Sequence, residues 1–230
     1  MAGKYIETDT RFYKRLLVIA VPVILQSLIT TGVNLVDNIM LGQLTETALS
    51  GSTQANQFIT LYTFVTMGIS MGASVLSSRY WGARDLVSLK KVITIALRFS
   101  LALALCFTAA NVFLPQYIMS LYFQPDAVGE IAAGVTYLRW STGCFVLMAI
   151  SLVLTNILRS MSLSAVPLLA SACAFGINIG ANYVLIFGKL GFPAMGVAGA
   201  ALGTFLARIV ETGVIMVSFF RNQRLRYRLK

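Results

Sequence analysis

The sequence predicts an all-α integral membrane protein with six membrane-spanning helices. Of its 230 residues, 57% are hydrophobic and only 11% are charged, whereas soluble domains average about 25% charged residues. A chain of this composition cannot cover a water-facing surface. Its apolar runs are far longer than the roughly 10-residue strands of an outer-membrane barrel, so we expect them to be helices.

Six apolar runs reach the length of about 20 residues that a helix needs to cross a bilayer. They place the spans at about residues 16–41, 54–78, 92–114, 131–157, 165–187 and 196–219. The flanking segments, residues 1–15 and 220–230, are polar and basic. The first apolar run is too long for the core of a signal peptide, so we expect an uncleaved first span.

Lysines and arginines fall almost entirely on one side of these spans. Fourteen of the 18 lie in the N-terminal segment, the second and fourth connections and the C-terminal tail, whereas the other three connections contain only Lys189. The positive-inside bias therefore predicts that both termini are cytoplasmic, in a plasma (inner) membrane. The same distribution explains the net charge of +10 without nucleic-acid binding.

The first span carries one polar stripe. Gln26, Thr30, Asn34 and Asp37 recur at intervals of four, four and three residues, which places them on one face of a helix. A charged carboxylate inside a bilayer costs about 2.5–3.5 kcal/mol. We therefore expect Asp37 to bind H⁺ or, transiently, Na⁺; the alternative is a carboxylate that reaches interfacial water. Pro22, in the same span, is expected to be a hinge or an ordinary packing kink.

The fifth span carries a polar pair. Asn178 and Asn182 lie four residues apart and share a helix face, which Ser171 extends. Amide oxygens can bind Na⁺, and amide groups can hydrogen-bond a protonated carboxyl group. The alternative role for the pair is hydrogen bonding between helices.

Matched spacing relates the first and fifth spans. Fifteen residues separate Pro22 from Asp37, and the same number separates Pro167 from Asn182. Both spans run outward in the predicted topology, so each polar residue lies about 22 Å beyond its proline. Asp37 and Asn182 are therefore expected at similar depth, in the outer half of the bilayer.

The sixth span contains Arg208 and Glu211, three residues apart. We expect an intrahelical ion pair that neutralises itself, with a gate between two conformations as the alternative. Close helix packing is expected at three GxxxG pairs, which are Gly68–Gly72, Gly176–Gly180 and Gly199–Gly203.

Enzymatic chemistry is not supported by the residue types. Residues 68–72, GISMG, match the G-x-S-x-G elbow of serine hydrolases, but the chain contains no histidine that could activate Ser70. The sequence also has no phosphate-binding G-x-x-x-x-G-K-[ST] motif. We therefore expect neither an enzyme nor a cofactor, and H⁺ or Na⁺ as a coupling ion.

The residues resemble a known transporter family at several places. These are VPVILQSLITTGVNLVDNIMLGQL in the first span, GASVLSSRYWGARD after the second, YLRW and LRSMSLSAVPLL around the fourth, and NIGANYVLIFGKLGFPAMGVAGAALGT across the fifth and sixth. They are similar to the multidrug and toxic compound extrusion (MATE) transporters. Proteins of that family have two six-helix lobes, and this chain resembles the N-terminal lobe.

The resemblance implies a cation-coupled antiporter lobe that exports organic cations by alternating access and needs a second six-helix lobe. It implies that Asp37 is the coupling carboxylate, that Pro22 lies at the bend of its helix, and that Asn178 and Asn182 are the fifth-helix polar pair. Some relatives carry Asp in place of Asn182, so the choice between H⁺ and Na⁺ stays open.

Two alternatives to this function remain. One is a flippase for lipid-linked precursors, which would line its cavity with several arginines; the sequence offers Arg139 and Arg208, beside a stripe that is acidic or neutral. The other is a truncated membrane protein that does not transport.

Overall fold

A computed structural model describes residues 10–221, and within them the chain is helical. The helices are α1 (Thr10–Gly42), α2 (Glu46–Gly82), α3 (Leu86–Phe113), α4 (Pro115–Ser120), α5 (Val128–Ser141), α6 (Cys144–Ser160), α7 (Ala165–Phe187) and α8 (Val197–Arg221). Five of them, α1, α2, α3, α7 and α8, are long and apolar enough to cross a membrane. The predicted all-α membrane fold is therefore confirmed for the described residues.

The predicted fourth span differs from the structure. The sequence suggested one helix over about residues 131–157, but α5 and α6 meet at a break and are bent by 59°. The pair counts as a sixth span only if the two helices are taken together. The helices α1, α2, α3, α7 and α8 lie over the other five predicted spans, and several extend further into the flanking polar residues.

Side chains near the break satisfy the backbone that the bend frees. The Leu138 carbonyl oxygen accepts hydrogen bonds from the Ser141 hydroxyl at 3.1 Å and the Thr142 hydroxyl at 3.1 Å. It also accepts one from the Asn111 amide of α3 at 2.7 Å. A backbone carbonyl without a partner is costly in a membrane, so these groups make the break tolerable there.

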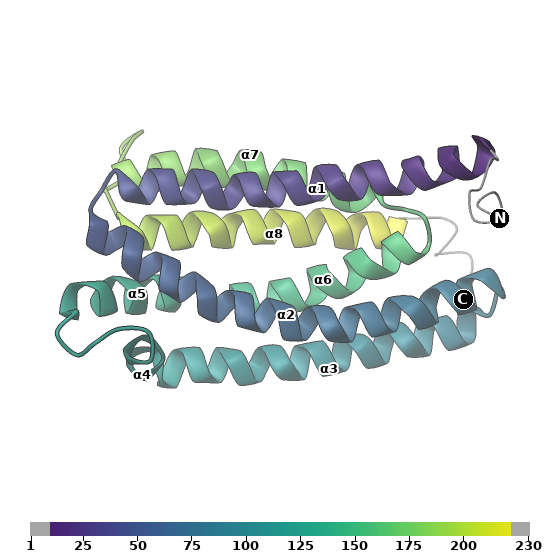
Figure 1. Cartoon of the computed structure of the whole chain (residues 1–230), viewed down its shortest axis with the longest axis horizontal. Coiled ribbons are helices and arrows are strands. Elements are labelled where there is room, and N and C mark those ends of the chain that lie inside the picture. The colour runs from purple at the N-terminus through teal and green to yellow at the C-terminus, as the bar shows by residue number, and fades with distance from the viewer. Residues whose placement is uncertain (1–9, 222–230) are drawn as a thin grey trace, which may run out of the picture.

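The long helices lie roughly side by side in a bundle (Figure 1). The start of α1, the α2–α3 and α6–α7 connections and the end of α8 are at one end, and the other connections are at the opposite end (Figure 1). Most basic residues of the described chain therefore lie at one end of the bundle, whereas Lys189 lies in the α7–α8 connection at the other. Asp85 caps α3 at the basic end by accepting hydrogen bonds from the backbone N–H and hydroxyl of Ser88. These bonds hold the pKa of Asp85 below its ordinary value.

The packed core lies among α2, α3, α5, α6 and α8. At its centre, Tyr62 of α2 packs edge-on against Phe145 of α6 and donates a hydrogen bond of 2.7 Å to the Phe145 carbonyl oxygen. Nearby, the Asn156 amide donates a 2.8 Å bond to the Ser70 hydroxyl. Ser70 therefore links α2 to α6, which is a structural role for the residue of the hydrolase-like motif.

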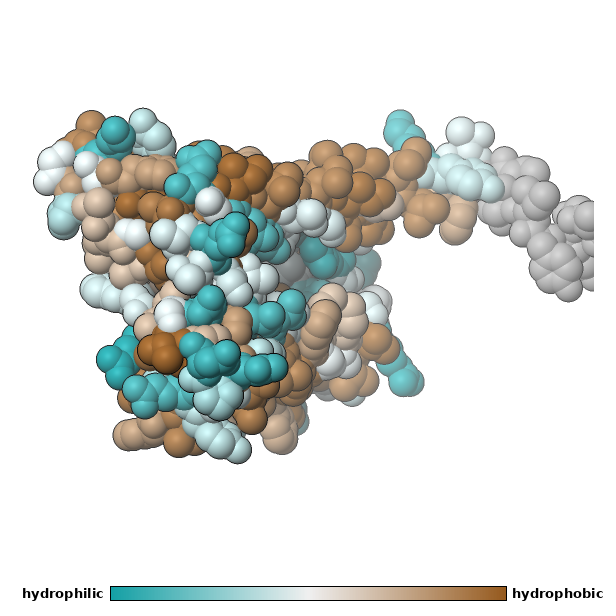
Figure 2. Space-filling model, turned by 60° about the vertical axis from the view of Figure 1, so that its left-hand side comes forward, coloured by the Kyte–Doolittle hydropathy of each residue, from teal (hydrophilic) through white to brown (hydrophobic). Residues whose placement is uncertain are grey.

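Except near its C-terminal end, where Leu41 is buried among core residues, helix α1 stands apart from this core. It packs mainly along α7 and has few contacts with α2 or α8. Its N-terminal part extends from the body as an apolar arm (Figure 2), on which Leu16, Leu17 and Val18 are exposed. Because α1 leans on α7 rather than on α2, space remains between α1 and the rest of the bundle.

Helices α7 and α8 approach each other through one of the three GxxxG pairs. A Cβ atom on Gly199 would lie 2.6 Å from the Leu185 carbonyl, and one on Gly203 would overlap the Asn182 side chain. A Cβ atom on any of the other four glycines, Gly68, Gly72, Gly176 or Gly180, would meet no atom within 4 Å. The prediction of close packing is therefore confirmed for Gly199–Gly203 and wrong for the other pairs within the described chain.

Candidate functional site

The first part of the candidate site is a group of polar side chains shared by α1, α7 and α8, which we name the Asp37 cluster (Asp37, Asn178, Asn182 and Thr204). The Asn182 amide nitrogen donates to the Asp37 carboxylate at 2.5 Å and lies 3.4 Å from the Asn178 amide oxygen. The Asn178 amide nitrogen in turn lies 3.4 Å from the Thr204 hydroxyl. The matched spacing of the two spans predicts only that Asp37 and Asn182 lie at similar depth, and the structure adds the direct contact between them.

The Asp37 cluster is enclosed by the packing of α8. Asp37 is 7% exposed, and Asn178 and Asn182 are almost completely buried. The Asn182 side chain fits only because Gly203 has no Cβ atom. Its amide oxygen is buried and has no hydrogen-bond partner among the described residues. The cluster thus combines a carboxylate with amide and hydroxyl oxygens, which are the ligands that suit a proton or Na⁺.

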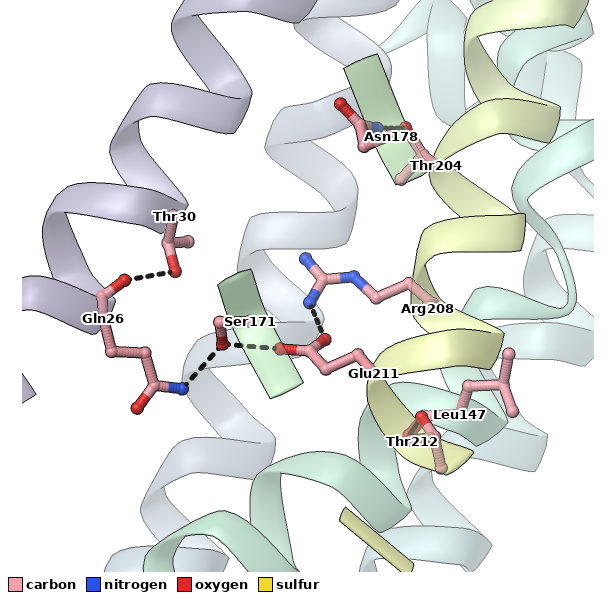
Figure 3. A network of polar contacts seen from close by, with 9 residues as sticks. All are labelled: Gln26, Thr30, Leu147, Ser171, Asn178, Thr204, Arg208, Glu211 and Thr212. Carbon is pink, nitrogen blue, oxygen red and sulfur yellow. Dashed lines mark hydrogen bonds and ion pairs between the residues drawn. The ribbon is translucent and has the colours of Figure 1, made fainter. Parts of the chain in front are cut away.

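A second group, which we name the Glu211 cluster (Gln26, Ser171, Arg208 and Glu211), lies along the same helices (Figure 3). Glu211 accepts a 2.6 Å charged bond from Arg208 on one carboxylate oxygen and a 3.0 Å bond from the Ser171 hydroxyl on the other. The Gln26 amide nitrogen donates to Ser171 at 2.9 Å. The expected pair of Arg208 and Glu211 is therefore present, and hydrogen bonds connect it to α1 through α7.

Arg159 of α6 extends the Glu211 cluster to a fourth helix. Its guanidinium donates a 2.7 Å hydrogen bond to the Gln26 amide oxygen. Gln26 thus uses its nitrogen toward α7 and its oxygen toward α6. Because Gln26 lies four residues after Pro22 on α1, this double contact fixes α1 one helical turn beyond its proline.

A small cavity of about 40 Å³ separates the two clusters. Its walls include Asn178 and Thr204 from the Asp37 cluster and Ser171, Arg208 and Glu211 from the Glu211 cluster. This volume exceeds what one water molecule needs, and the walls offer several polar partners. The two clusters are thus separate groups of contacts that border one common polar space.

A larger cavity of about 460 Å³ lies between α1, α2, α6 and α8. Most of its lining residues are polar and uncharged, and they are joined by a few apolar side chains such as Met67, Met148 and Leu152. Its charged lining residues are Arg159, Arg208 and Glu211. The volume lies within the range of about 300–1,000 Å³ that is typical of sites for small organic molecules.

The predicted polar stripe of α1 divides between these features. Asp37 and Gln26 are buried in the two clusters, whereas Thr30 and Asn34 are exposed side chains that line the larger cavity. Thr30 donates to the Gln26 backbone carbonyl at 3.0 Å. Pro22 lies inside α1, which continues as one helix on both sides of it.

Sequence reasoning did not identify Arg159 or Thr204 as site residues. In the sequence Arg159 is one basic residue among several at a helix end. Thr204 lies on a different helix from Asn178, and helical periodicity cannot relate residues of two helices. Of the two arginines that the sequence offered for the cavity, Arg208 lines the larger cavity and Arg139 does not, whereas Arg159 does. Arg159 reaches it from the end of α6, where its guanidinium bonds to Gln26.

Comparison with known proteins places these features in a family. The sequence matches the family model MatE over residues 22–184. The chain belongs to the MatE family. A probable multidrug resistance protein NorM of Thermotoga maritima is 26% identical over 216 residues, which cover 94% of this chain and 46% of that relative. A probable multidrug resistance protein YoeA of Bacillus subtilis is 30% identical over 160 residues, 70% of this chain and 34% of that relative.

Solved structures share the MatE fold with this chain. A crystal structure of MATE in the straight conformation has a TM-score of 0.80 at 23% identity and covers 92% of this chain. One of MATE in the bent conformation has a TM-score of 0.78 at 23% identity. In these matches and in the curated relative from Thermotoga maritima, the chain spans about half the length of the other protein. It therefore corresponds to one lobe of a MatE transporter.

Proposed function

We propose that this chain is the N-terminal lobe of a cation-coupled exporter of organic cations. In this proposal H⁺ or Na⁺ binds at Asp37, and its neighbours Asn178, Asn182 and Asn34 assist. Both termini lie in the cytoplasm, in keeping with the basic residues at that end of the bundle. Transport requires a second six-helix lobe, supplied by the rest of a longer chain or by a partner.

The observation that carries this proposal is the 2.5 Å contact between the Asp37 carboxylate and Asn182 in a buried group of oxygen ligands. A buried carboxylate is costly while it is charged and unneutralised, so binding of H⁺ or Na⁺ stabilises it. Asn182 still has a buried amide oxygen without a partner, which Na⁺ would use as a ligand. The cluster is thus suited to binding and releasing a cation.

Export of the organic cation is coupled to entry of H⁺ or Na⁺ if the two cations cannot be bound at the same time. A bound H⁺ or Na⁺ neutralises Asp37 and removes the attraction for a positively charged molecule in the adjoining cavity. Asn34 lies one helical turn before Asp37 and lines the larger cavity, so it connects the two sites along α1. Bending of α1 at Pro22 would then change the access to the cavity.

A flippase for lipid-linked precursors is less well supported. Such a protein would present several uncompensated arginines to a pyrophosphate. Of the two arginines that line the larger cavity, Arg208 is already paired with Glu211. The one remaining guanidinium, that of Arg159, would not neutralise the several negative charges of a pyrophosphate.

The proposal is tested by gradient-driven efflux from vesicles that contain this chain together with a second six-helix lobe. Ethidium efflux would be followed by fluorescence under an imposed H⁺ or Na⁺ gradient. Asp37→Asn keeps the size of the side chain and one oxygen that can accept from Asn182 but removes the charge, so we expect it to abolish the gradient-dependent part of efflux. Asp126→Asn changes an exposed carboxylate in the α4–α5 connection and serves as the matched control. Undiminished gradient-driven efflux by Asp37→Asn would contradict the role of Asp37.

A further inference from the structure

A hollow of about 180 Å³ lies between α2 and α3 on the outer surface of the bundle. Its walls are apolar, and they are formed by Ile69, Ala73 and Leu76 of α2 and by Val92, Ile95, Ala96 and Phe99 of α3. Ala73 and Ala96 are buried, whereas Leu76, Ile95 and Phe99 are exposed. Because α2 and α3 are long and apolar enough to cross a membrane, this hollow faces lipid. Hydrocarbon fills it in a bilayer, since an empty space would lose packing contacts.

The missing side chain of Gly72 keeps the hollow open toward the lipid. Gly72 lies three residues after Ile69 and four before Leu76, which places it on their side of α2. It is exposed, and a Cβ atom built there would meet no atom within 4 Å. A side chain at this position would therefore have room, and it would lie over the hollow.

Three basic residues border the hollow. Arg79 lies three residues after Leu76 on α2, and on α3 Lys91 and Arg98 lie four residues before and three residues after Ile95. Residues at these spacings are neighbours on a helix surface, so each basic residue shares a face with a lining residue. All three are exposed, and none of them forms an ion pair with a carboxylate among residues 10–221.

Helix geometry directs these basic side chains toward one another. Side chains of a helix lean toward its N-terminus. Helix α2 ends and α3 begins at the same end of the bundle, so Arg79 leans toward the hollow and Arg98 leans back toward Lys91. Arg98 lies seven residues, or about 10 Å, deeper than Lys91. A long arginine side chain covers part of that distance by extending along the helix.

The surroundings of the hollow are strongly positive. Residues 79–98 include five basic residues and one acidic residue, Asp85. Both carboxylate oxygens of Asp85 accept hydrogen bonds from Ser88, so they are used in the cap of α3. Tyr80 and Trp81 follow directly on the first of these basic residues, and such aromatic residues are enriched at the membrane interface. The basic groups therefore lie at the level of the lipid headgroups, and the hollow lies at the level of the acyl chains.

From this arrangement we infer that the α2–α3 face binds an anionic phospholipid. One acyl chain occupies the hollow, and Arg79, Lys91 and Arg98 bind the phosphate group. The lining covers seven residues on each helix, or about 10 Å, which suits the part of an acyl chain nearest the headgroup. Guanidinium groups match phosphate oxygens through paired hydrogen bonds. The lipid belongs to the leaflet at the α2–α3 end, which is the cytoplasmic leaflet in the proposed topology.

Native mass spectrometry of the full chain tests this inference. The protein would be reconstituted in nanodiscs with equal amounts of dioleoylphosphatidylglycerol and dioleoylphosphatidylcholine, and the lipid molecules that stay bound after release from the nanodisc would be counted. The two lipids have the same acyl chains and the same phosphate group, but choline cancels the negative charge of the second. The measurement needs no ion gradient and no transported molecule.

Two variants remove separate parts of the lipid site. In the first, Arg79, Lys91 and Arg98 are all replaced by glutamine. The second, Gly72→Phe, places a ring over the hollow and leaves every charge in place. A matched control replaces three exposed basic residues of α1 and α8 at the same end of the bundle by glutamine, and these are Arg11, Lys14 and Arg221.

We expect the original chain to retain phosphatidylglycerol over phosphatidylcholine by about tenfold. The first variant should lower this preference to within about twofold, because the charges that distinguish the lipids are lost. Its retention of phosphatidylcholine should be unchanged, which also shows that the variant is folded. Gly72→Phe should reduce the bound phosphatidylglycerol by about half or more, because the ring takes the place of the acyl chain. The control should behave as the original chain does.

Three results would overturn the inference. Equal retention of the two lipids by the original chain would mean that the face does not select an anionic headgroup. An equal loss in the control and in the first variant would mean that the whole basic end attracts anionic lipid without a site. Unchanged retention by Gly72→Phe would mean that no acyl chain uses the hollow. None of these results bears on Asp37, so the proposed function stands or falls separately.

Discussion

Replacing Gly199 by alanine should destabilise the bundle, because α7 and α8 touch through backbone at that point. The added Cβ atom would lie 2.6 Å from the carbonyl carbon and oxygen of Leu185. Ordinary contacts of this kind are about 3.4–4 Å, so the helices must separate by roughly 1 Å. The Leu185 carbonyl also accepts a 2.9 Å hydrogen bond from the Met195 N–H, which resists that movement.

The expected size of the effect follows from two opposing terms. Overpacking of a well-packed contact costs about 1–3 kcal/mol. Alanine favours a helix over glycine by about 0.5–1 kcal/mol. Because the 2.6 Å contact is with backbone, which cannot rotate away, the overpacking cost should lie in the upper half of that range, at about 2–3 kcal/mol. Gly199→Ala should therefore lower the free energy of unfolding by about 1–2.5 kcal/mol net. Gly180→Ala supplies a matched control, because Gly180 belongs to another GxxxG pair whose Cβ position is open.

The assay is unfolding in mixed micelles with increasing sodium dodecyl sulfate, followed by circular dichroism. We expect Gly180→Ala to leave the free energy of unfolding unchanged or to raise it slightly, since only the higher helix propensity of alanine over glycine applies there. The reasoning would be refuted if both variants were destabilised alike, or if Gly199→Ala were as stable as the original chain. Either result would mean that the approach of α7 to α8 is looser than the structure describes.

Three further variants test separate contacts in the same assay or by hydrogen exchange. Asn111→Leu removes the α3 donor to the carbonyl at the α5–α6 break, so it should lower the free energy of unfolding by about 1–2 kcal/mol; an unchanged value would contradict the account of the bend. Tyr62→Phe loses only its hydrogen bond to Phe145 and should cost about 0.5–1.5 kcal/mol. Asp85→Ala should speed amide exchange at Ser88 at neutral pH. Because the pKa of Asp85 is lowered in the folded chain, the cap of the original protein should be lost only as pH falls below the ordinary range of an aspartate.

The presence of long apolar helices and the matched register of Asp37 and Asn182 could be predicted from the sequence. The length of an apolar run identifies a membrane span almost regardless of how the helix packs. This is because the hydrocarbon core of a bilayer requires the backbone to form its own hydrogen bonds in a helix. The matched register followed from equal spacing beyond two prolines on helices that run in the same direction, and the direct contact is what the structure adds. Depth along a membrane helix is a one-dimensional quantity, so residue counting is sufficient to predict it.

Features that depend on lateral packing could not be predicted in the same way. Nothing local distinguishes Gly199–Gly203 from Gly176–Gly180, since the difference is the presence of a neighbouring helix. The break before Cys144 lies within an apolar run, and its cost is offset by Asn111 from a distant helix. Arg159 reaches the site only because the end of α6 packs near Gln26.

The most direct test of the central claim is whether the coupling cation and an organic cation compete through Asp37. Binding of tetraphenylphosphonium to the chain in liposomes would be measured at increasing Na⁺ concentration and, separately, at decreasing pH. The account predicts that at least one of the two cations weakens binding to the original chain and has no such effect on Asp37→Asn. Competition of equal strength in both proteins, or no competition in the original chain, would contradict it.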